Sequence, residues 1–342
     1  MINAKLYLTS ESSKDISNVA RILDNAIIAY RISNATGTIP ELFTNEYVAA
    51  GSTIALGRFT FRSNGASKYE KGFCWSTTDE PTIADKKSTE KFNNRGDIYR
   101  MDKLNPSTIY YVRPYIITRG YQVAYGKTVK IATLPMGNMT YIYDNGGGLE
   151  ENNRIKSALE ETIWLYNNLS YVRGINLDVH YGASTPTADC SYGGWMRVGP
   201  NSSYQQTGTI LHEASHGVGV GTSNEWWSNI FREEGDRGRW LGPRTTEMIQ
   251  FLNNDATAFM TGDNMHMWPI SAFDCPHFGI NGAFEDTTNP ENTLLYFGNV
   301  MLVHAMHQDG LICSSQGGSI SPAYVMNQGD SLKYYIKNIA VR

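Results

Sequence analysis

The pentapeptide His-Glu-Ala-Ser-His at residues 212–216 carries the side chains with the clearest chemistry in this chain. On a helix, His212 and His216 lie one turn apart on the same face, where two imidazoles can bind one tetrahedral zinc ion at about 2.0–2.1 Å each. Glu213 follows the first histidine too closely to join the same ligand set. Its carboxylate can instead deprotonate a metal-bound water, whose pKa such an ion lowers to about 7. The pattern therefore predicts hydrolysis with Zn²⁺ as the cofactor.

The neighbouring residues favour the helix and strands that would position this motif. Ser202 and Ser203 are candidate N-caps, and Gly217, Gly219 and Gly221 predict an abrupt helix end. Upstream, residues 175–181 alternate apolar and polar side chains, which is typical of a half-buried strand. Residues 193–199 follow as a second short strand, predicted at the sheet edge.

The motif resembles the metzincin peptidases, because residues 212–219 match their opening H-E-x-x-H-x-x-G. In that family a third histidine follows the glycine by three residues, but Thr222 stands at the matching position. The family also has a methionine turn beneath the metal, and residues 262–269 are similar to a variant of it. The resemblance spans about residues 137–311 and implies a zinc peptidase in which the third ligand comes from elsewhere.

Several residues are candidates for the third ligand. His266 ranks first, because neutral imidazole is the commonest zinc ligand and the resemblance places it near the metal. Asp263 is an alternative ligand, or it orients a histidine from behind. His277 is a further alternative and could instead stabilise an oxyanion. Glu225 would complete a two-histidine, one-glutamate set, but that set normally draws its glutamate from a separate helix.

The remaining histidines and the cysteines are expected to have structural roles. His180 is predicted to be solvated on the polar face of a strand, and His304 and His307 to pack or lie on the surface of a late helix. The four cysteines lack C-x-x-C spacing, so they predict no metal knuckle. A disulfide between Cys190 and Cys275 is one alternative, and the state of Cys313 is left open.

Composition limits the classes of function. A chain of 342 residues with 41% hydrophobic residues is expected to fold into two domains. Its net charge of −4 and the absence of a basic run argue against nucleic-acid binding. No apolar stretch approaches the roughly 20 residues of a transmembrane helix. The 21 tyrosines and 7 tryptophans favour a secreted or bacterial cell-surface protein, with an export signal expected to have been removed. A cytoplasmic protein is the alternative.

Three segments are predicted along the chain. Residues 1–37 contain an amphipathic helix, with apolar residues at helical spacing. Residues 38–135 contain short strands separated by turns and resemble a bacterial fibronectin type III module at 72–85 and at 104–115. That resemblance implies an all-β sandwich, in which a tyrosine near the 104–106 turn bonds back to the turn backbone. Residues 136–342 are predicted to form an α+β, metzincin-like (zincin) domain that ends in a β-hairpin at 319–342.

The metzincin resemblance implies a zinc peptidase with Glu213 as general base, and the fibronectin type III resemblance implies a secreted or cell-surface setting. Its substrate would be a protein or peptide, including glycoproteins, and the strand Trp195–Val198 could pair with it in extended form. Trp195 and Trp268 are expected to line the cleft. The alternative is a non-catalytic adhesin or glycan-binding protein on a degenerate peptidase scaffold. Hydrolysis of a non-peptide amide or ester would use the same zinc chemistry, and the oligomeric state is left open.

Overall fold

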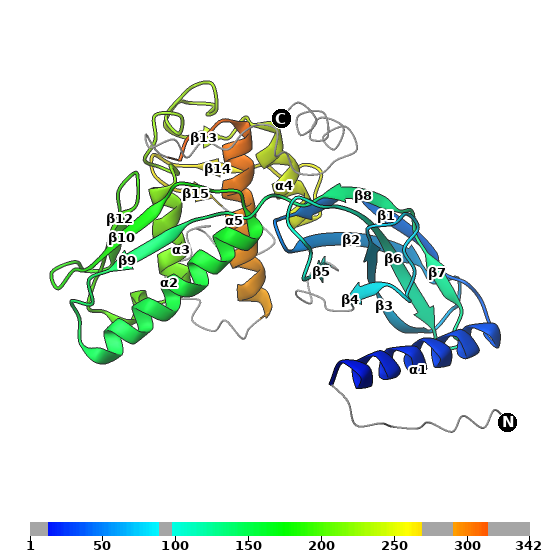
Figure 1. Cartoon of the computed structure of the whole chain (residues 1–342). Coiled ribbons are helices and arrows are strands. Elements are labelled where there is room, and N and C mark those ends of the chain that lie inside the picture. The colour runs from blue at the N-terminus through cyan, green and yellow to red at the C-terminus, as the bar shows by residue number, and fades with distance from the viewer. Residues whose placement is uncertain (1–12, 89–97, 269–289, 314–342) are drawn as a thin grey trace.

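The computed structural model describes residues 13–88, 98–268 and 290–313, in a β-rich N-terminal part and a C-terminal part of mixed helices and strands. Figure 1 shows the two parts side by side, with the helix α1 (Ser13–Ser33) below the β-rich part. Predictions made for His277, Cys275 and the hairpin at 319–342 fall outside the described residues. Within the described ranges, no helix combines the length and apolar character needed to cross a bilayer.

The N-terminal part consists of two antiparallel sheets packed around one core. One sheet has the order β1-β2-β5, and the other has the order β4-β3-β6-β7 with β8 also paired to β6. The strands are β1 Glu41–Ala50, β2 Ala55–Arg62, β3 Lys68–Ser76, β4 Lys86–Ser88, β5 Ile98–Met101, β6 Ile109–Thr118, β7 Val123–Tyr125 and β8 Val129–Ala132. The core includes Phe59 from the first sheet and Phe73 from the second, with ring centroids 5.5 Å apart. This arrangement is sandwich-like.

The predicted tyrosine corner is confirmed. The hydroxyl oxygen of Tyr110 accepts a hydrogen bond of 3.0 Å from the backbone N–H of Asn105. Tyr110 is 3% exposed, so its hydroxyl needs a partner when the ring enters the core. The bond ties the 104–106 turn to the start of β6.

The C-terminal part contains a four-stranded mixed sheet in the order β11-β12-β10-β9. Strands β9 (Thr140–Tyr143) and β12 (Trp195–Val198) run parallel to β10 (Asn176–Tyr181), and β11 (Ala188–Cys190) runs antiparallel to β12. The helices are α2 (Leu149–Leu169), α3 (Thr207–Gly217), α4 (Pro243–Asn253) and α5 (Pro290–Asp309). A small sheet of β13 (Gly238–Arg239), β14 (Thr261–Gly262) and β15 (Met267–Trp268) completes this part.

The position of β12 corrects the expectation that it forms the sheet edge. It pairs with β10 on one side and with β11 on the other, so its backbone groups already have partners and cannot bind an extended substrate. The end strand next to α3 is β11. Alternation along β12 buries Met196 and Val198 against the helices and turns Trp195 and Arg197 to the opposite face.

Buried polar contacts join the two parts. The backbone N–H groups of Ser52 and Thr53 donate to the carbonyl oxygen of Asn168, near the end of α2. Arg58 on β2 is 4% exposed and donates through Nε to the carbonyl oxygen of Phe251 at 2.7 Å and through Nη2 to that of Leu252. These are among the last carbonyls of α4, where the helix ladder ends, and that of Phe251 also accepts the capping N–H of Asn254 at 3.3 Å. The guanidinium therefore donates hydrogen bonds to a helix end across the interface. Its positive charge also interacts favourably with the negative C-terminal end of the helix dipole.

We predict that Arg58→Ala lowers the free energy of unfolding by about 2–4 kcal/mol, because it removes two buried charge-assisted hydrogen bonds to carbonyl oxygens. Urea denaturation would measure the loss. Arg62→Ala is the matched control on the same strand, where the side chain is 69% exposed and pairs with Glu41 at 3.2 Å. It should cost less than about 1 kcal/mol. Equal losses for the two variants would contradict the role given to Arg58.

Candidate metal centre

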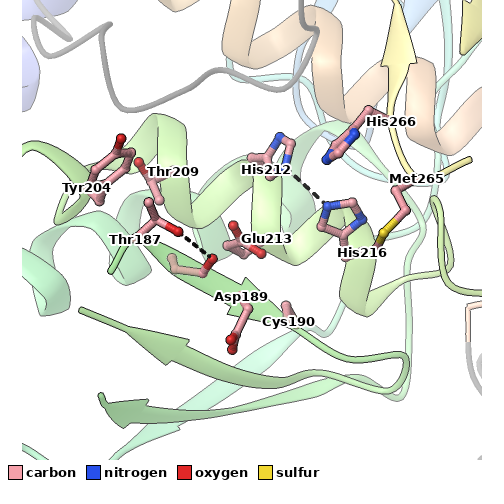
Figure 2. Close-up of a pocket in the computed structure, with 11 residues that line it drawn as sticks. Thr187, Asp189, Cys190, Tyr204, Thr209, His212, Glu213, His216, Met265 and His266 are labelled. Carbon is pink, nitrogen blue, oxygen red and sulfur yellow. Dashed lines mark hydrogen bonds between the residues drawn. The ribbon is translucent and has the colours of Figure 1, made fainter. Parts of the chain in front are cut away.

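Helix α3 places one row of functional side chains in a pocket. Thr209, His212, Glu213 and His216 follow the i, i+3, i+4, i+7 spacing of one helix face, and all four line the pocket shown in Figure 2. The helix begins at Thr207, later than the predicted serine caps suggested. Residues Ser202–Tyr204 form a separate 3₁₀ turn, capped by the side chain of Asn201.

Three imidazoles converge at the C-terminal end of this row. His212, His216 and His266 each offer a ring nitrogen, and these atoms all lie within 4.8 Å of one another. The Nε2 atoms of His212 and His216 are 3.1 Å apart. Nitrogens bound to one tetrahedral zinc at about 2.0–2.1 Å lie roughly 3.4 Å from each other, so the His212 and His216 pair is already close to this spacing, and the more distant nitrogens would have to approach by up to about 1.4 Å. The donor set therefore fits a zinc ion.

The hydrogen bonds of two of these histidines leave the correct nitrogen facing the cluster. Nδ1 of His216 lies 2.7 Å from the carbonyl oxygen of Val220, which can only accept, so this nitrogen carries the proton. Burial lowers the pKa of His216 and favours its neutral form, with the lone pair on Nε2. Nδ1 of His266 lies 3.3 Å from Oδ1 of Asp263. Asp263 thus stands behind His266, as one of its two predicted roles requires.

Asp263 also shapes the loop that carries His266. Its Oδ1 accepts the backbone N–H of Met265 at 2.8 Å and that of His266 at 2.7 Å. Burial tends to raise the pKa of Asp263, but these two hydrogen bonds, together with the nearby His266 side chain, outweigh it and lower the pKa. The carboxylate therefore remains ionised beside the imidazole.

A glycine after α3 allows this loop to approach. Gly221 has φ +71°, and a Cβ on it would lie 2.0 Å from the carbonyl oxygen of Met265. No side chain fits at that distance, so position 221 must be glycine for His266 to reach the other two rings. Thr222, where the metzincins have a histidine, donates its hydroxyl to the carbonyl oxygen of His216 and so holds the helix end.

Glu213 lies in the same pocket as the three imidazoles. Its side chain is buried, and burial together with the charge of Asp189 raises its pKa to about 8. In the metal-free protein the carboxyl is therefore mainly protonated at neutral pH. A divalent cation at the histidine cluster would favour the carboxylate and oppose this shift.

The rest of the pocket was not predicted. It has a volume of about 360 Å³ and is also lined by residues 187–190, Tyr204 and Met265. Residues 188–190 are β11, whose antiparallel partner is β12. Its short sequence, Ala-Asp-Cys, has none of the β-branched or aromatic residues that mark strands, so only the sheet pairing reveals it.

Other predicted site residues lie elsewhere. Trp195 does not line the pocket: it is 43% exposed beside His180 on the opposite sheet face, with ring centroids 5.8 Å apart. Trp268 belongs to β15, but its side chain lies outside the described part of the structure. Glu225 is absent from the residues that line the pocket. His304 and His307 are buried on α5, as packing residues would be.

His180 is paired rather than simply solvated. Its Nδ1 lies 3.1 Å from Asp144, and its Nε2 lies 3.2 Å from Asp178. Burial hides Cys74 completely and raises the pKa of its thiol to about 12, which suits an inert core residue.

No protein-family model matches the chain, and no curated protein matches it. Among solved structures, it is weakly similar to human fibronectin type III domains. The sixth such domain of fibronectin type III domain containing protein 3 is 17% identical, covering 30% of this chain and 94% of that domain, with a TM-score of 0.21. Another domain of a protein of that name is 14% identical, covering 33% of this chain and 98% of its own length at a TM-score of 0.23. A Yersinia enterocolitica family 28 exopolygalacturonase is 10% identical, covering 48% of this chain and 38% of its own, at 0.26.

Gly221→Ala is predicted to weaken zinc binding about 10- to 100-fold, because the added methyl group pushes the Met265 carbonyl and His266 away from α3. Competition with a chromophoric chelator would measure the affinity. Gly65→Ala is the matched control: Gly65 has φ +82° and no atom within 4 Å of an added Cβ, so it carries the backbone strain without the collision. Zinc affinity unchanged in Gly221→Ala would contradict the proposed approach.

Glu213→Gln is predicted to stabilise the metal-free protein. With its pKa raised to about 8, Glu213 keeps its proton in the folded state while the unfolded state loses it above about pH 4.5, so stability falls as pH rises between these values. The variant should match the parent near pH 4 and exceed it by about 3 kcal/mol at pH 7. Urea denaturation with chelator present would test this. Glu150→Gln, at a side chain 91% exposed, should give no such pH-dependent gain.

Proposed function

We propose that this protein is a zinc-dependent peptidase of metzincin-like type, acting after secretion or at the cell surface. The observation that carries the proposal is one pocket that holds the buried carboxyl of Glu213 and three imidazoles, each with a ring nitrogen within 4.8 Å of the others. His212, His216 and His266 would hold the ion. The last of these would take the place that the metzincin pattern gives to the position of Thr222.

Zinc held there would supply an acidified water and Lewis acidity toward the substrate carbonyl. Glu213 accepts the proton from the attacking water and later donates it to the leaving amine. Burial raises its pKa and a nearby cation would lower it again, and a carboxyl balanced in this way can take up a proton and give it back. Burial keeps His216 neutral, and its bond to the Val220 carbonyl fixes the proton on Nδ1, so the Nε2 lone pair remains available.

A peptide substrate is favoured by the strand at the mouth of the pocket. β11 lines the pocket and, among the described strands, pairs only with β12. An extended peptide laid along the other side of β11 could form backbone hydrogen bonds and bring a peptide carbonyl to the histidine cluster. This role moves from Trp195–Val198 to Ala188–Cys190, since β12 lies inside the sheet.

Glu213→Ala tests the mechanism directly. We predict that the variant keeps one zinc per chain, measured by atomic emission, while cleavage of fluorescently labelled casein falls about 10²- to 10⁴-fold. Glu150→Ala, in which an exposed carboxyl on α2 is removed, is the matched control and should cleave at the parental rate.

Two outcomes would overturn the proposal. One is a zinc-loaded Glu213→Ala protein that digests casein as fast as the parent. The other is a purified parent that takes up no stoichiometric zinc. Glycan binding by that metal-free parent would point to the adhesin alternative.

A further inference from the structure

We propose that Arg232 is the positioning residue that holds His266 in the metal centre, with Trp226 and Trp227 as its partners. The inference rests on the proposed zinc site and concerns how its third ligand is held in place. Arg232 lies in the segment that follows α3, sixteen residues after His216 in the sequence. It has no contact with substrate in this proposal and acts only through the loop at 262–267.

The carbonyl oxygens of this loop point toward these three side chains. Arg232 donates through Nη2 to the carbonyl oxygen of Gly262 at 2.7 Å and reaches that of Asp263 at 3.4 Å. The indole N–H groups of Trp226 and Trp227 both donate to the carbonyl oxygen of Asn264, at 3.0 and 2.8 Å. Three consecutive carbonyls ahead of Met265 and His266 are therefore held from one side.

The loop is closed on itself on its other side. The N–H of Asp263 donates to the carbonyl oxygen of His266 at 2.9 Å, and the Asp263 carboxylate accepts the N–H of His266. With the loop closed in this way, a shift at Gly262 or Asn264 is carried to the imidazole as a rigid displacement. A ligand position must be kept within about 0.5 Å for a good metal site.

The burial of Arg232 indicates that this side chain orders the loop rather than serving as a surface charge. Its side chain is fully buried, and its Nε has no hydrogen-bond partner. Burial lowers its pKa to about 10, although the charges of Asp236 and Asp263 partly oppose that. A buried guanidinium held mainly by carbonyl oxygens is weak evidence for stability, whereas the geometric order it imposes is useful.

Arg232 itself rests on a rigid aromatic base. Its guanidinium lies 4.3 Å from the ring centroid of Trp226, which is fully buried. Trp226 lies next to Trp240 at 6.1 Å, and Trp240 stacks on Phe231 at 5.3 Å. The indole N–H of Trp240 donates to Asp309 at the end of α5. Arg232, Trp226 and Trp227, which together form a clamp on the 262–267 loop, are thus anchored to the helical core rather than to another loop.

A double-mutant cycle on zinc affinity tests the proposal, with Arg232→Lys keeping the positive charge but not the planar fork. In the parent, Arg232→Lys should weaken zinc binding about 10- to 100-fold, the range for residues that orient a ligand. In a His266→Ala background the same change should have almost no further effect. Cobalt substitution gives a second readout, since loss of one imidazole should alter the visible spectrum in the same way in Arg232→Lys and His266→Ala.

The controls separate the possible failures. Arg239→Lys changes a neighbouring exposed arginine on β13 and should leave zinc affinity unchanged. If Arg232→Lys does not fold, Trp227→Phe removes one N–H at a half-exposed ring and should cost a few-fold in zinc affinity. Trp195→Phe is the matched control, because Trp195 is about as exposed as Trp227 and lies on the sheet face away from the pocket, and it should leave zinc affinity unchanged.

Equal zinc losses from Arg232→Lys with and without His266, or no loss in any of the clamp variants, would overturn the role of Arg232 while leaving the zinc site intact. A parent that binds no zinc would instead overturn the proposed function itself.

Discussion

The approach of one loop to the end of one helix is the contact on which the candidate site depends. Helix α3 can present His212 and His216 by its own periodicity, but two imidazoles do not make a tetrahedral site. The third ring comes from a loop fifty residues further along the chain, and that loop must reach the backbone at Gly221. The absence of a side chain there sets the distance, and Asp263 sets the direction of the ring.

Several features of this region lower the stability of the fold, and their place in a candidate site explains why they are present. Burial raises the pKa of the Glu213 carboxyl and lowers the pKa of the Arg232 guanidinium. Strained or desolvated groups of this kind cluster at functional sites and persist because the surrounding structure holds them. The stabilisation comes from elsewhere in the fold: the packed helices of the C-terminal part, and the sandwich that donates Arg58 to the end of α4.

The sandwich is therefore more than an appended spacer in this structure. Ile54, in the turn between β1 and β2, and Leu56 of β2 share one core with α2 and the central strands of the C-terminal part. Polar bonds from Ser52 and Thr53 lie beside that shared core. The two parts are packed on each other through both kinds of contact.

Local patterns in the sequence were enough to predict the features that depend only on residues close together in the chain. The spacing of His212, Glu213 and His216, the alternation that became β10, and the tyrosine corner at Tyr110 all follow from periodicities of helix and strand or from a short turn. Contacts between segments far apart in the sequence could not be predicted in this way. His266 could be ranked first among the ligand candidates on chemistry and on a family resemblance, yet only the folded chain brings its ring to the other two.

The same limit explains the corrections. The stretch Trp195–Val198 reads as a strand, but sequence does not say which strand pairs with which, and the short Ala188–Cys190 segment took the end position beside the pocket. Arg232 gave no signal at all, because an arginine in a loop normally points to water, and only the burial of its surroundings turned it toward the carbonyls of Gly262 and Asp263. The sequence alone determined a helix with paired imidazoles and an adjacent carboxylate. The tertiary structure decided the third ring, the strand beside it and the clamp behind it, since each depends on contacts between residues far apart in the chain.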